Sequence, residues 1–317
     1  MNNPRSLPRG DGAGDSRAGF FCALAAYGLW GFLPLYMKLV DHIDPVEVVA
    51  NRAFWSLPVA GVILFWLGRT SDILPTLKSP KRLGVLAVTA GIISVNWGIY
   101  VWAIAVGRTV EAALGYYINP LISVLMGAVF LGERFTRLQI VAIGLATLAV
   151  VVLTVGQGAL PWVSLVLAFS FALYGYLRKT VDVGPTQGFL VEVLLLSVIA
   201  LPYLGWITAS GASVFFDSAS NMALLIGCGP VTAIPLILYA FGAKKLRLST
   251  IGLMQYIAPT LIFLIGVFVF KEPFGLVRLF AFTLIWLALV LYTWSMLRQR
   301  GVAQEKNRQI PAESAQQ

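Results

Sequence analysis

The chain has 317 residues, of which 58% are hydrophobic and only 12% are charged, and its mean hydropathy is +0.83. Soluble domains are about 45–50% apolar and about 25% charged, so this composition excludes a water-soluble globular protein. The net charge of +9 could indicate nucleic-acid binding, but the basic residues stand in small groups between apolar runs. That placement is typical of a membrane protein.

Ten apolar runs follow one another along the chain, and each approaches the roughly 20 residues that a membrane-spanning helix needs. They cover residues 19–39, 48–68, 84–106, 111–131, 138–155, 160–177, 188–209, 222–242, 250–270 and 274–297. Helices are expected because a bilayer offers no water to the backbone and because the runs lack the alternation of barrel strands. The sequence therefore predicts an all-α integral membrane protein with ten transmembrane helices.

Lysine and arginine are distributed unevenly between the two sides when the N-terminal tail, residues 1–18, is assigned to the cytoplasm. The segments on the cytoplasmic side then hold 18 basic residues, and the opposite side holds four, namely Lys38, Arg108, Lys271 and Arg278. Basic residues collect in cytoplasmic loops, so this split predicts an even number of spans and two cytoplasmic termini. We expect a multi-pass protein of the cell inner (cytoplasmic) membrane, with disordered tails at 1–18 and 298–317.

An internal repeat relates the fourth and ninth runs. GYYINPLISVLMGAVFLGERF from Gly115 aligns with MQYIAPTLIFLIGVFVFKEPF from Met254 at a constant offset of 139 residues. The offset pairs Tyr117 with Tyr256, Ile118 with Ile257, Pro120 with Pro259, Glu133 with Glu272 and Phe135 with Phe274. The copies lie five spans apart, so they cross the membrane in opposite directions. This predicts an inverted repeat of two five-helix halves, 19–155 and 156–297, as in alternating-access transporters.

Polar and aromatic residues in three of the runs predict a central cavity for a solute. These candidates are Asn96, Trp97 and Tyr100 in the third run, Tyr117 and Asn119 in the fourth, and Gln255 and Tyr256 in the ninth. Such a lining suits uncharged, zwitterionic or aromatic solutes, although tryptophan and tyrosine also anchor helices at membrane interfaces. Pro120 and Pro259 are candidate helix breaks beside this site, or ordinary kinks that shape the bundle.

Two ionisable residues, Arg52 and Glu192, lie inside the second and seventh runs, at equivalent repeat positions with an offset of 140. An unpaired charge at the centre of a membrane costs about 2.5–3.5 kcal/mol on insertion scales. Each is therefore a functional candidate, Arg52 for binding an anionic group and Glu192 for handling substrate or protons. If the two paired with each other, their role would be structural.

Motifs of enzymes and metal sites are missing from the sequence. The single histidine, His42, stands outside the apolar runs, Cys22 and Cys228 lie inside them, and there is no phosphate-binding loop or zinc motif. We therefore expect no catalytic residues, no metal and no cofactor. Without ATP binding, transport would draw on a solute or ion gradient, with protons as a candidate coupling ion.

Several sequence blocks resemble one transporter family over nearly the whole chain. They are AYGLWGFLPLYMKL from Ala26, EVVANRAFWSLP from Glu47, VNWGIYVWA from Val95, GYYINPLISVLMGAVFLGER from Gly115, FALYGYLRK from Phe171 and QYIAPTLIFLIGVF from Gln255. They are similar to the RarD-type permeases of the EamA branch of the drug/metabolite transporter superfamily. The resemblance implies a ten-helix inverted-repeat fold with cytoplasmic ends and a central cavity, and the family label is linked to chloramphenicol.

These observations together predict a secondary transmembrane transporter, or permease, of small organic solutes such as drugs or metabolites. It would work by alternating access around a midplane cavity. The alternative is a non-transporting membrane protein that acts through a partner, which the short loops disfavour. The oligomeric state and the transported solute do not follow from the sequence.

Overall fold

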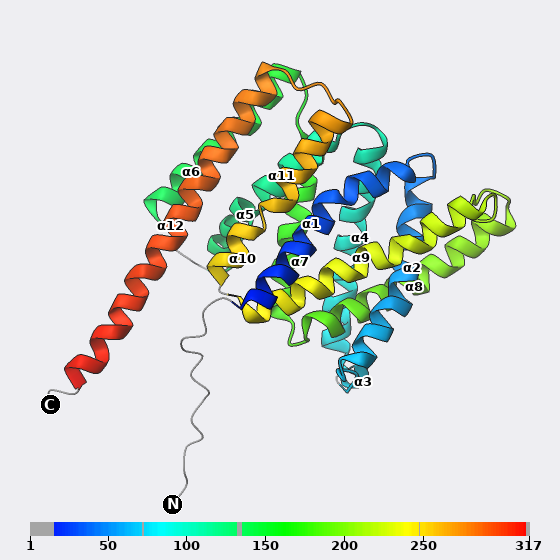
Figure 1. The fold of residues 1–317 in the computed structure, drawn as a ribbon, viewed down its shortest axis with the longest axis horizontal. Helices are drawn as coiled ribbons and strands as arrows, with labels where there is room; N and C mark the ends of the chain where they lie inside the picture. Colours follow the sequence, from blue (N-terminus) through cyan, green and yellow to red (C-terminus); the bar gives the residue numbers. More distant parts are fainter. Residues whose placement is uncertain (1–15, 72, 132–134, 247, 315–317) are drawn as a thin grey trace, which may run out of the picture.

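The computed structural model describes residues 16–71, 73–131, 135–246 and 248–314, and within these ranges every regular element is a helix (Figure 1). The first five helices are α1 (Arg17–Leu39), α2 (Pro45–Trp66), α3 (Ile73–Leu77), α4 (Pro80–Ala105) and α5 (Thr109–Leu131). They are followed by α6 (Arg137–Gln157), α7 (Trp162–Thr180), α8 (Pro185–Ala209) and α9 (Ala219–Lys245). The chain ends with α10 (Leu248–Met254), α11 (Ile257–Leu264), the π-helical turn η1 (Ile265–Val269) and α12 (Leu276–Ser314).

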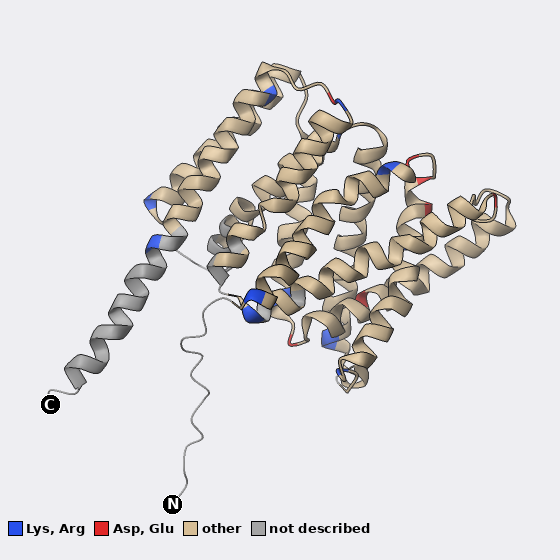
Figure 2. Ribbon diagram, in the orientation of Figure 1, with Lys and Arg blue, Asp and Glu red and all other residues tan. Residues whose placement is uncertain are grey.

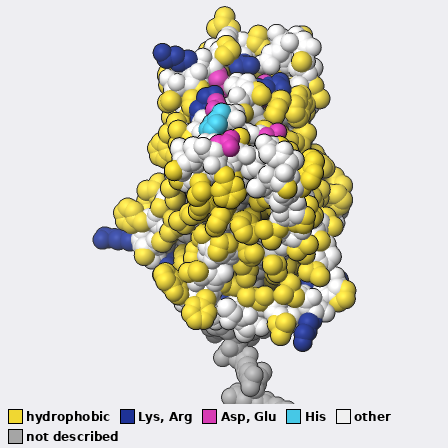
Figure 3. Space-filling model, turned by 90° about the vertical axis from the view of Figure 1, so that its right-hand side faces the viewer, with side chains coloured by type: hydrophobic (Ala, Val, Ile, Leu, Met, Phe, Trp, Pro, Cys, Tyr) yellow, Lys and Arg dark blue, Asp and Glu magenta, His cyan; other side chains and the backbone are white. Residues whose placement is uncertain are grey.

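Seven of the helices described are long and apolar enough to cross a membrane: α1, α2, α4, α6, α8, α9 and α12. The all-helical membrane class is therefore confirmed. The other three predicted runs coincide with α5, α7 and the segment from α10 to η1, so a total of ten crossings stays a prediction. Lysine and arginine lie towards the helix ends in Figure 2, and Figure 3 shows an apolar belt with charged side chains above it.

Local capping fixes where several helices begin. Asp44 precedes α2 and its carboxylate accepts hydrogen bonds from the backbone N–H groups of Val46 at 2.8 Å and Glu47 at 3.3 Å. Thr136 and Gln139 exchange hydrogen bonds in a capping box at the start of α6. Such caps satisfy amide groups that would otherwise have no partner near the membrane.

Helices distant in sequence pack side by side in the bundle. On one side, α2 lies against α8 and α9, and α1 also lies against α9. In the middle, α7 packs between α4 and α5, while α11 packs on α1 and α5. Helices α6 and α12 form a pair at the left of Figure 1. Helix α5 connects the α6–α12 pair to the other helices, and its buried face contributes to the main apolar core.

The two candidate helix breaks differ in the structure. Helix α5 continues through Pro120 without interruption, so no break is seen there. In the ninth run the chain leaves regular helix at Gln255 and Tyr256, just before Pro259. Proline has no N–H group, so Pro259 cannot bond to the carbonyl four residues earlier, which belongs to Gln255. The π-helical turn η1 interrupts the same segment again.

The C-terminal tail differs from the expectation of disorder, because α12 continues past residue 298 as far as Ser314. The sequence after the span includes the helix formers Ala303, Gln304, Glu305 and Lys306, and no proline occurs before Pro311. Nothing therefore ends the helix at the membrane boundary. The N-terminal tail lies almost wholly outside the described residues.

One repeat residue, Glu272, caps a helix of the other half. Its carboxylate oxygens accept hydrogen bonds from the backbone N–H groups of Thr109 at 2.6 Å and Val110 at 2.9 Å, at the start of α5. A negative charge is favourable there because the N-terminus of a helix carries partial positive charge. Its repeat partner Glu133 lies outside the described residues. Glu272 therefore ties the segment after η1 to the first turn of α5.

Replacing Gly115 by alanine is expected to destabilise the protein by about 1–3 kcal/mol, the usual cost of overpacking. A Cβ at this position of α5 would lie 2.8 Å from the carbonyl oxygen of Ser164 in α7, and a backbone atom of that kind moves only with its helix. Gly144→Ala on α6 is the matched control, since its Cβ would meet nothing within 4 Å. Equal unfolding free energies for the two variants, measured by SDS titration in mixed micelles, would contradict the close approach of α5 and α7.

Candidate functional site

Arg52 lies inside the bundle on α2 and is only 4% exposed. Its Nε atom donates a hydrogen bond to the Thr232 hydroxyl of α9 at 2.7 Å. On another side, the guanidinium carbon lies 4.6 Å from the centre of the Trp97 ring of α4, a cation–π contact. Thr232 in turn donates to the backbone carbonyl of Cys228 at 2.7 Å. The arginine is thus held by two helices that come from different halves of the sequence.

Two tyrosines and an asparagine extend this group towards α5 and α7. The Tyr116 hydroxyl of α5 donates to the Asn96 side-chain oxygen at 3.4 Å, and its ring lies 5.9 Å from that of Tyr100. Asn96 itself donates to the Ser170 hydroxyl at 2.8 Å and to the backbone of α7. We call these residues the Arg52 cluster: Arg52, Asn96, Trp97, Tyr100, Tyr116 and Thr232.

Hydrogen-bonding capacity is left over in the Arg52 cluster. The Nη1 atom of Arg52 and the hydroxyl of Tyr100 are both buried and have no hydrogen-bond partner within the described part of the chain. A buried polar group without a partner costs about 1–3 kcal/mol, and more if it is charged. The cluster is therefore incomplete as it stands.

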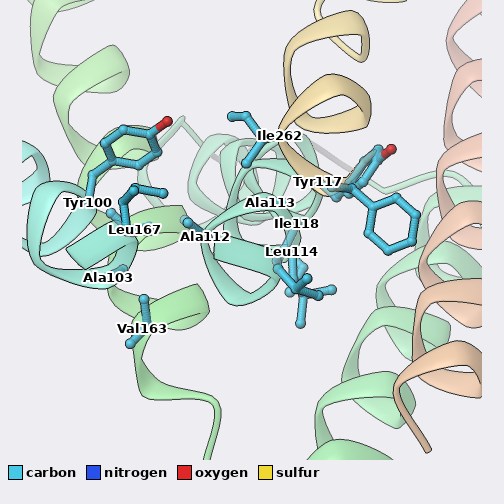
Figure 4. Packing of buried hydrophobic residues seen from close by; sticks show 14 of the residues in the cluster. Tyr100, Ala103, Ala112, Ala113, Leu114, Tyr117, Ile118, Val163, Leu167 and Ile262 are labelled. Atoms are coloured by element: carbon cyan, nitrogen blue, oxygen red, sulfur yellow. The ribbon is translucent and has the colours of Figure 1, made fainter. Parts of the chain in front are cut away.

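The remaining aromatic candidates lie elsewhere. The Tyr117 hydroxyl bonds to Thr260 of α11 at 2.7 Å, and its ring packs against Phe282 and Trp286 of α12. Figure 4 shows Tyr100 and Tyr117 on opposite sides of α5, separated by the small residues Ala112 and Ala113. The structure therefore does not gather all seven candidates around one cavity.

The other candidates of the fourth and ninth runs also lie apart from Arg52. Asn119 donates to the backbone carbonyl of Ala168 at 3.1 Å and so joins α5 to α7. Gln255 and Tyr256 lie in the interruption between α10 and α11, and the Tyr256 carbonyl accepts a hydrogen bond from Thr260 at 2.7 Å. Through Thr260, Tyr256 is linked to Tyr117 instead of to the Arg52 cluster.

Glu192 of α8 is 1% exposed and has three partners of its own. It accepts hydrogen bonds from Thr89 of α4 at 2.7 Å and Tyr174 of α7 at 3.0 Å, and Arg178 lies 3.5 Å away as an ion pair. Arg178 also donates to the carbonyl groups of Gly184 and Pro185. An ion pair between Arg52 and Glu192 is not found among the described residues, because Arg52 bonds to Thr232 of α9 whereas Glu192 pairs with Arg178 of α7.

Several members of these two sites were missed from the sequence. Thr89, Tyr174 and Thr232 are single polar residues in apolar runs, and nothing in their spacing marks them. Arg178 was counted with the basic residues of a loop, although it lies within α7 and is largely buried. Its position two residues before the end of α7 was the available signal, because a long side chain there can reach back into the bundle.

Comparison with known proteins gives a family for this arrangement. Residues 17–155 match the model of the EamA-like transporter family. The Protein RarD of Streptomyces exfoliatus is 44% identical over 90% of this chain and 90% of its own length. The Chloramphenicol-sensitive protein RarD of Pseudomonas aeruginosa is 33% identical over 89% of this chain and 96% of its own length.

The chain belongs to the EamA-like transporter family as a RarD-type permease. The family match ends at residue 155, where the sequence places the end of the first half. A solved crystal structure that is 18% identical covers 89% of this EamA-like chain and 98% of its own, with a TM-score of 0.59. That likeness shows a shared fold and carries no information about the solute.

In this EamA-like chain, Glu192→Ala is expected to lower the free energy of unfolding by about 3 kcal/mol, because it leaves Arg178 buried without its charge partner. The double variant Glu192→Leu with Arg178→Met should recover most of that loss, since it removes both charges together. The measurement is SDS titration of the two purified variants and the wild type. A double variant as unstable as the single one would contradict the ion pair as the cause.

Proposed function

We propose that this RarD-type permease is a secondary transporter that moves small organic solutes across the cytoplasmic membrane by alternating access. In this proposal ten helices cross the membrane as an inverted repeat of two five-helix halves, residues 19–155 and 156–297. The two polar ends lie in the cytoplasm. The observation that carries the proposal is that helix contacts and polar bonds between the two halves occur in corresponding pairs.

The packing pairs support a repeat in which α1, α2, α4, α5 and α6 correspond to α7, α8, α9, α10–α11 and α12. Under this correspondence the contact of α1 with α9 matches that of α7 with α4, and both occur. The contact of α5 with α7 likewise matches that of α11 with α1. The correspondence exchanges α2 with α8 and α6 with α12, so each of these two contacting pairs is mapped onto itself, as expected for helices beside a two-fold axis.

Polar bonds follow the same correspondence. Arg52 of α2 bonds to Thr232 of α9, and Glu192 of α8 bonds to Thr89 of α4. Arg52 and Glu192 are the residues that the sequence aligns at an offset of 140. Each half therefore presents one charged side chain to a threonine of the other half. Contacts of this kind lie where two rocking halves of a carrier would separate and meet.

The difference in continuity between α5 and its counterpart in the repeat also supports alternating access. Helix α5 is continuous, whereas its counterpart is divided at Gln255 and Tyr256 and again at η1. Interrupted helices are common beside the solute site of transporters with inverted repeats. If the halves exchange roles during transport, the interrupted segment supplies the bending that the exchange needs.

The proposed solutes are drugs or metabolites that fit an aromatic, partly polar site. Trp97, Tyr100 and Tyr116 offer ring faces and edges, which favour solutes that carry an aromatic ring. Chloramphenicol, which has such a ring, is one candidate, and the name of the Pseudomonas relative mentions it. The sequence contains no phosphate-binding motif for ATP, so we propose that an ion or solute gradient supplies the energy for transport. Protons are the proposed coupling ion, and Glu192 is the proposed carrier of the proton.

The proposed orientation predicts that a fluorescent protein fused after Gln317 will fold and fluoresce in living cells, because that end lies in the cytoplasm. An alkaline phosphatase fused at the same place should stay inactive, since it needs export to an oxidising compartment. The reverse pattern is expected for fusions in the α8–α9 loop after Ala212. The opposite result at the C-terminus would contradict the cytoplasmic placement of that end.

Purified protein in sealed vesicles is expected to take up labelled chloramphenicol, aromatic amino acids or aromatic acids with saturable kinetics. Trp97→Ala should reduce the uptake at least about tenfold, because it removes a ring from the site and the cation–π contact with Arg52. Trp294→Ala is the matched control, since this tryptophan is 65% exposed on α12. Uptake is measured with and without a pH gradient.

A requirement for the pH gradient that disappears in Glu192→Gln would support proton coupling. Flux that follows the solute gradient alone, in the wild type and in this variant alike, would remove protons from the proposal. No flux of any solute would favour a non-transporting membrane protein that acts through a partner.

A further inference from the structure

Arg52 is a buried cation without an anionic partner. Among the described residues the ion pairs are Lys38 with Asp41, Arg82 with Asp182, Arg108 with Glu111, and Arg178 with Glu192. Arg52 has only a hydroxyl and an aromatic ring as close partners. Arginine keeps its charge in proteins, so the interior of the bundle contains a positive charge that the described chain does not balance.

The contrast with Glu192 makes the missing partner more informative. The two residues occupy corresponding repeat positions and are nearly equally buried, at 4% and 1% exposure. Glu192 has an ion pair and two hydroxyl donors, so its charge is fully provided for. Arg52 has one hydroxyl acceptor and, unlike Arg178, no carboxylate partner among the described residues, although the Nη1 atoms of both arginines lack a hydrogen bond there. Glu192 is neutralised by Arg178, so a purely structural arginine at this depth would be expected to have a carboxylate partner in the same way.

Two buried donors of the Arg52 cluster could bind an anion. The Nη1 atom needs an acceptor, and so does the buried hydroxyl of Tyr100, which has no partner in the part of the chain described. Tyr100 lies one helical turn after Trp97, whose ring contacts the guanidinium group. A carboxylate has two oxygen atoms, so it can accept from a guanidinium N–H group and from a tyrosine hydroxyl at once.

The aromatic members of the cluster indicate what else the ligand carries. The Tyr100 and Tyr116 rings meet edge to face at 5.9 Å, and Tyr116 also contacts Phe171 of α7. Together with Trp97, they place apolar ring surface next to the positive charge. A ligand with an aromatic or other apolar body and one carboxylate would match both parts of the cluster. A neutral solute, chloramphenicol included, would leave the arginine without a partner, so this inference favours carboxylates over that candidate.

We propose that the Arg52 cluster is the binding site for the carboxylate of the transported solute, and that the solutes are organic anions or zwitterions with an aromatic body. The substrate assignment rests on the proposed transport function, whereas binding at Arg52 can be tested without transport. The carboxylate supplies the charge that the protein lacks, and the rings hold the body of the solute.

The test compares carboxylates with the corresponding primary amides, which lack the carboxylate charge, on the purified full-length protein in detergent. The probes are phenylacetate, indole-3-acetate and phenylalanine, each beside its primary amide, at constant ionic strength and with sulfate replacing chloride. The carboxylates are expected to raise the melting temperature by several degrees, since a ligand that binds only the folded state stabilises it. The amides should have no effect.

Four variants assign the effect to the site. Arg52→Gln should abolish the shift and weaken carboxylate binding about tenfold or more, because it removes a charge-assisted bond. Arg52→Lys keeps the charge and should retain part of the shift. Thr232→Val keeps the arginine but removes its hydroxyl partner, so it also tests the cluster if Arg52→Gln fails to fold. Arg82→Gln, which replaces an arginine paired with the exposed Asp182, should respond like the wild type.

The same probes are then measured as labelled solutes in sealed vesicles. Carboxylate stabilisation through Arg52 without any flux would leave the binding site standing and refute transport. Flux of amides and carboxylates at equal rates, unchanged in Arg52→Gln, would support transport and overturn the carboxylate site. Equal stabilisation by amides and carboxylates, a shift by chloride alone, or no shift with any probe would also overturn it.

Discussion

The lack of water inside a bilayer is the constraint on which this structure depends. Helices in lipid gain little from hiding apolar surface from one another, so close packing and polar bonds must join them. Gly115 lets α5 approach the backbone of α7, and the Ser164 hydroxyl crosses that contact to the Glu111 carbonyl at 2.6 Å. Gly229 allows α9 a similarly close approach to the backbone of α2 beside Trp55. Small residues and hydroxyl groups thus decide which helices meet.

The helical spans could be predicted because a bilayer imposes one simple rule on sequence, which is length and apolar character. That rule located the long helices but not the short α3, and it did not decide which of the two candidate prolines accompanies an interruption. Pro120 and Pro259 look alike in sequence, yet α5 passes through the first and the chain leaves helix before the second. The difference depends on what the neighbouring helices offer the freed carbonyl groups, and a single sequence does not contain that information.

The candidate site could be predicted only in part, for a related physical reason. Composition identified Arg52, Trp97 and Tyr100, because charged and aromatic residues inside an apolar run are rare and costly to place. It also grouped Tyr117 with them, although Tyr117 faces α11 and α12 from the other side of its helix. Which face of a helix a residue occupies is weakly encoded when the whole helix is apolar. The partners Thr89 and Thr232 were missed because single threonines are ordinary in membrane helices.

The two charged residues at corresponding repeat positions show how similar halves can acquire different roles. Glu192 is enclosed by an ion pair and two hydroxyl groups, and this network joins α4, α7 and α8. Arg52 joins α2 to α9 and, through the Trp97 ring, to α4, and it has no anionic partner among the described residues. A charge that has its partners within the fold stabilises the arrangement of helices in which those partners meet. A buried charge without a partner destabilises the arrangement that buries it until a ligand supplies the partner. In the proposed transport function, the carrier must close around its solute and not around empty space, and an arginine that gains its partner only from the solute would give the closed arrangement that preference.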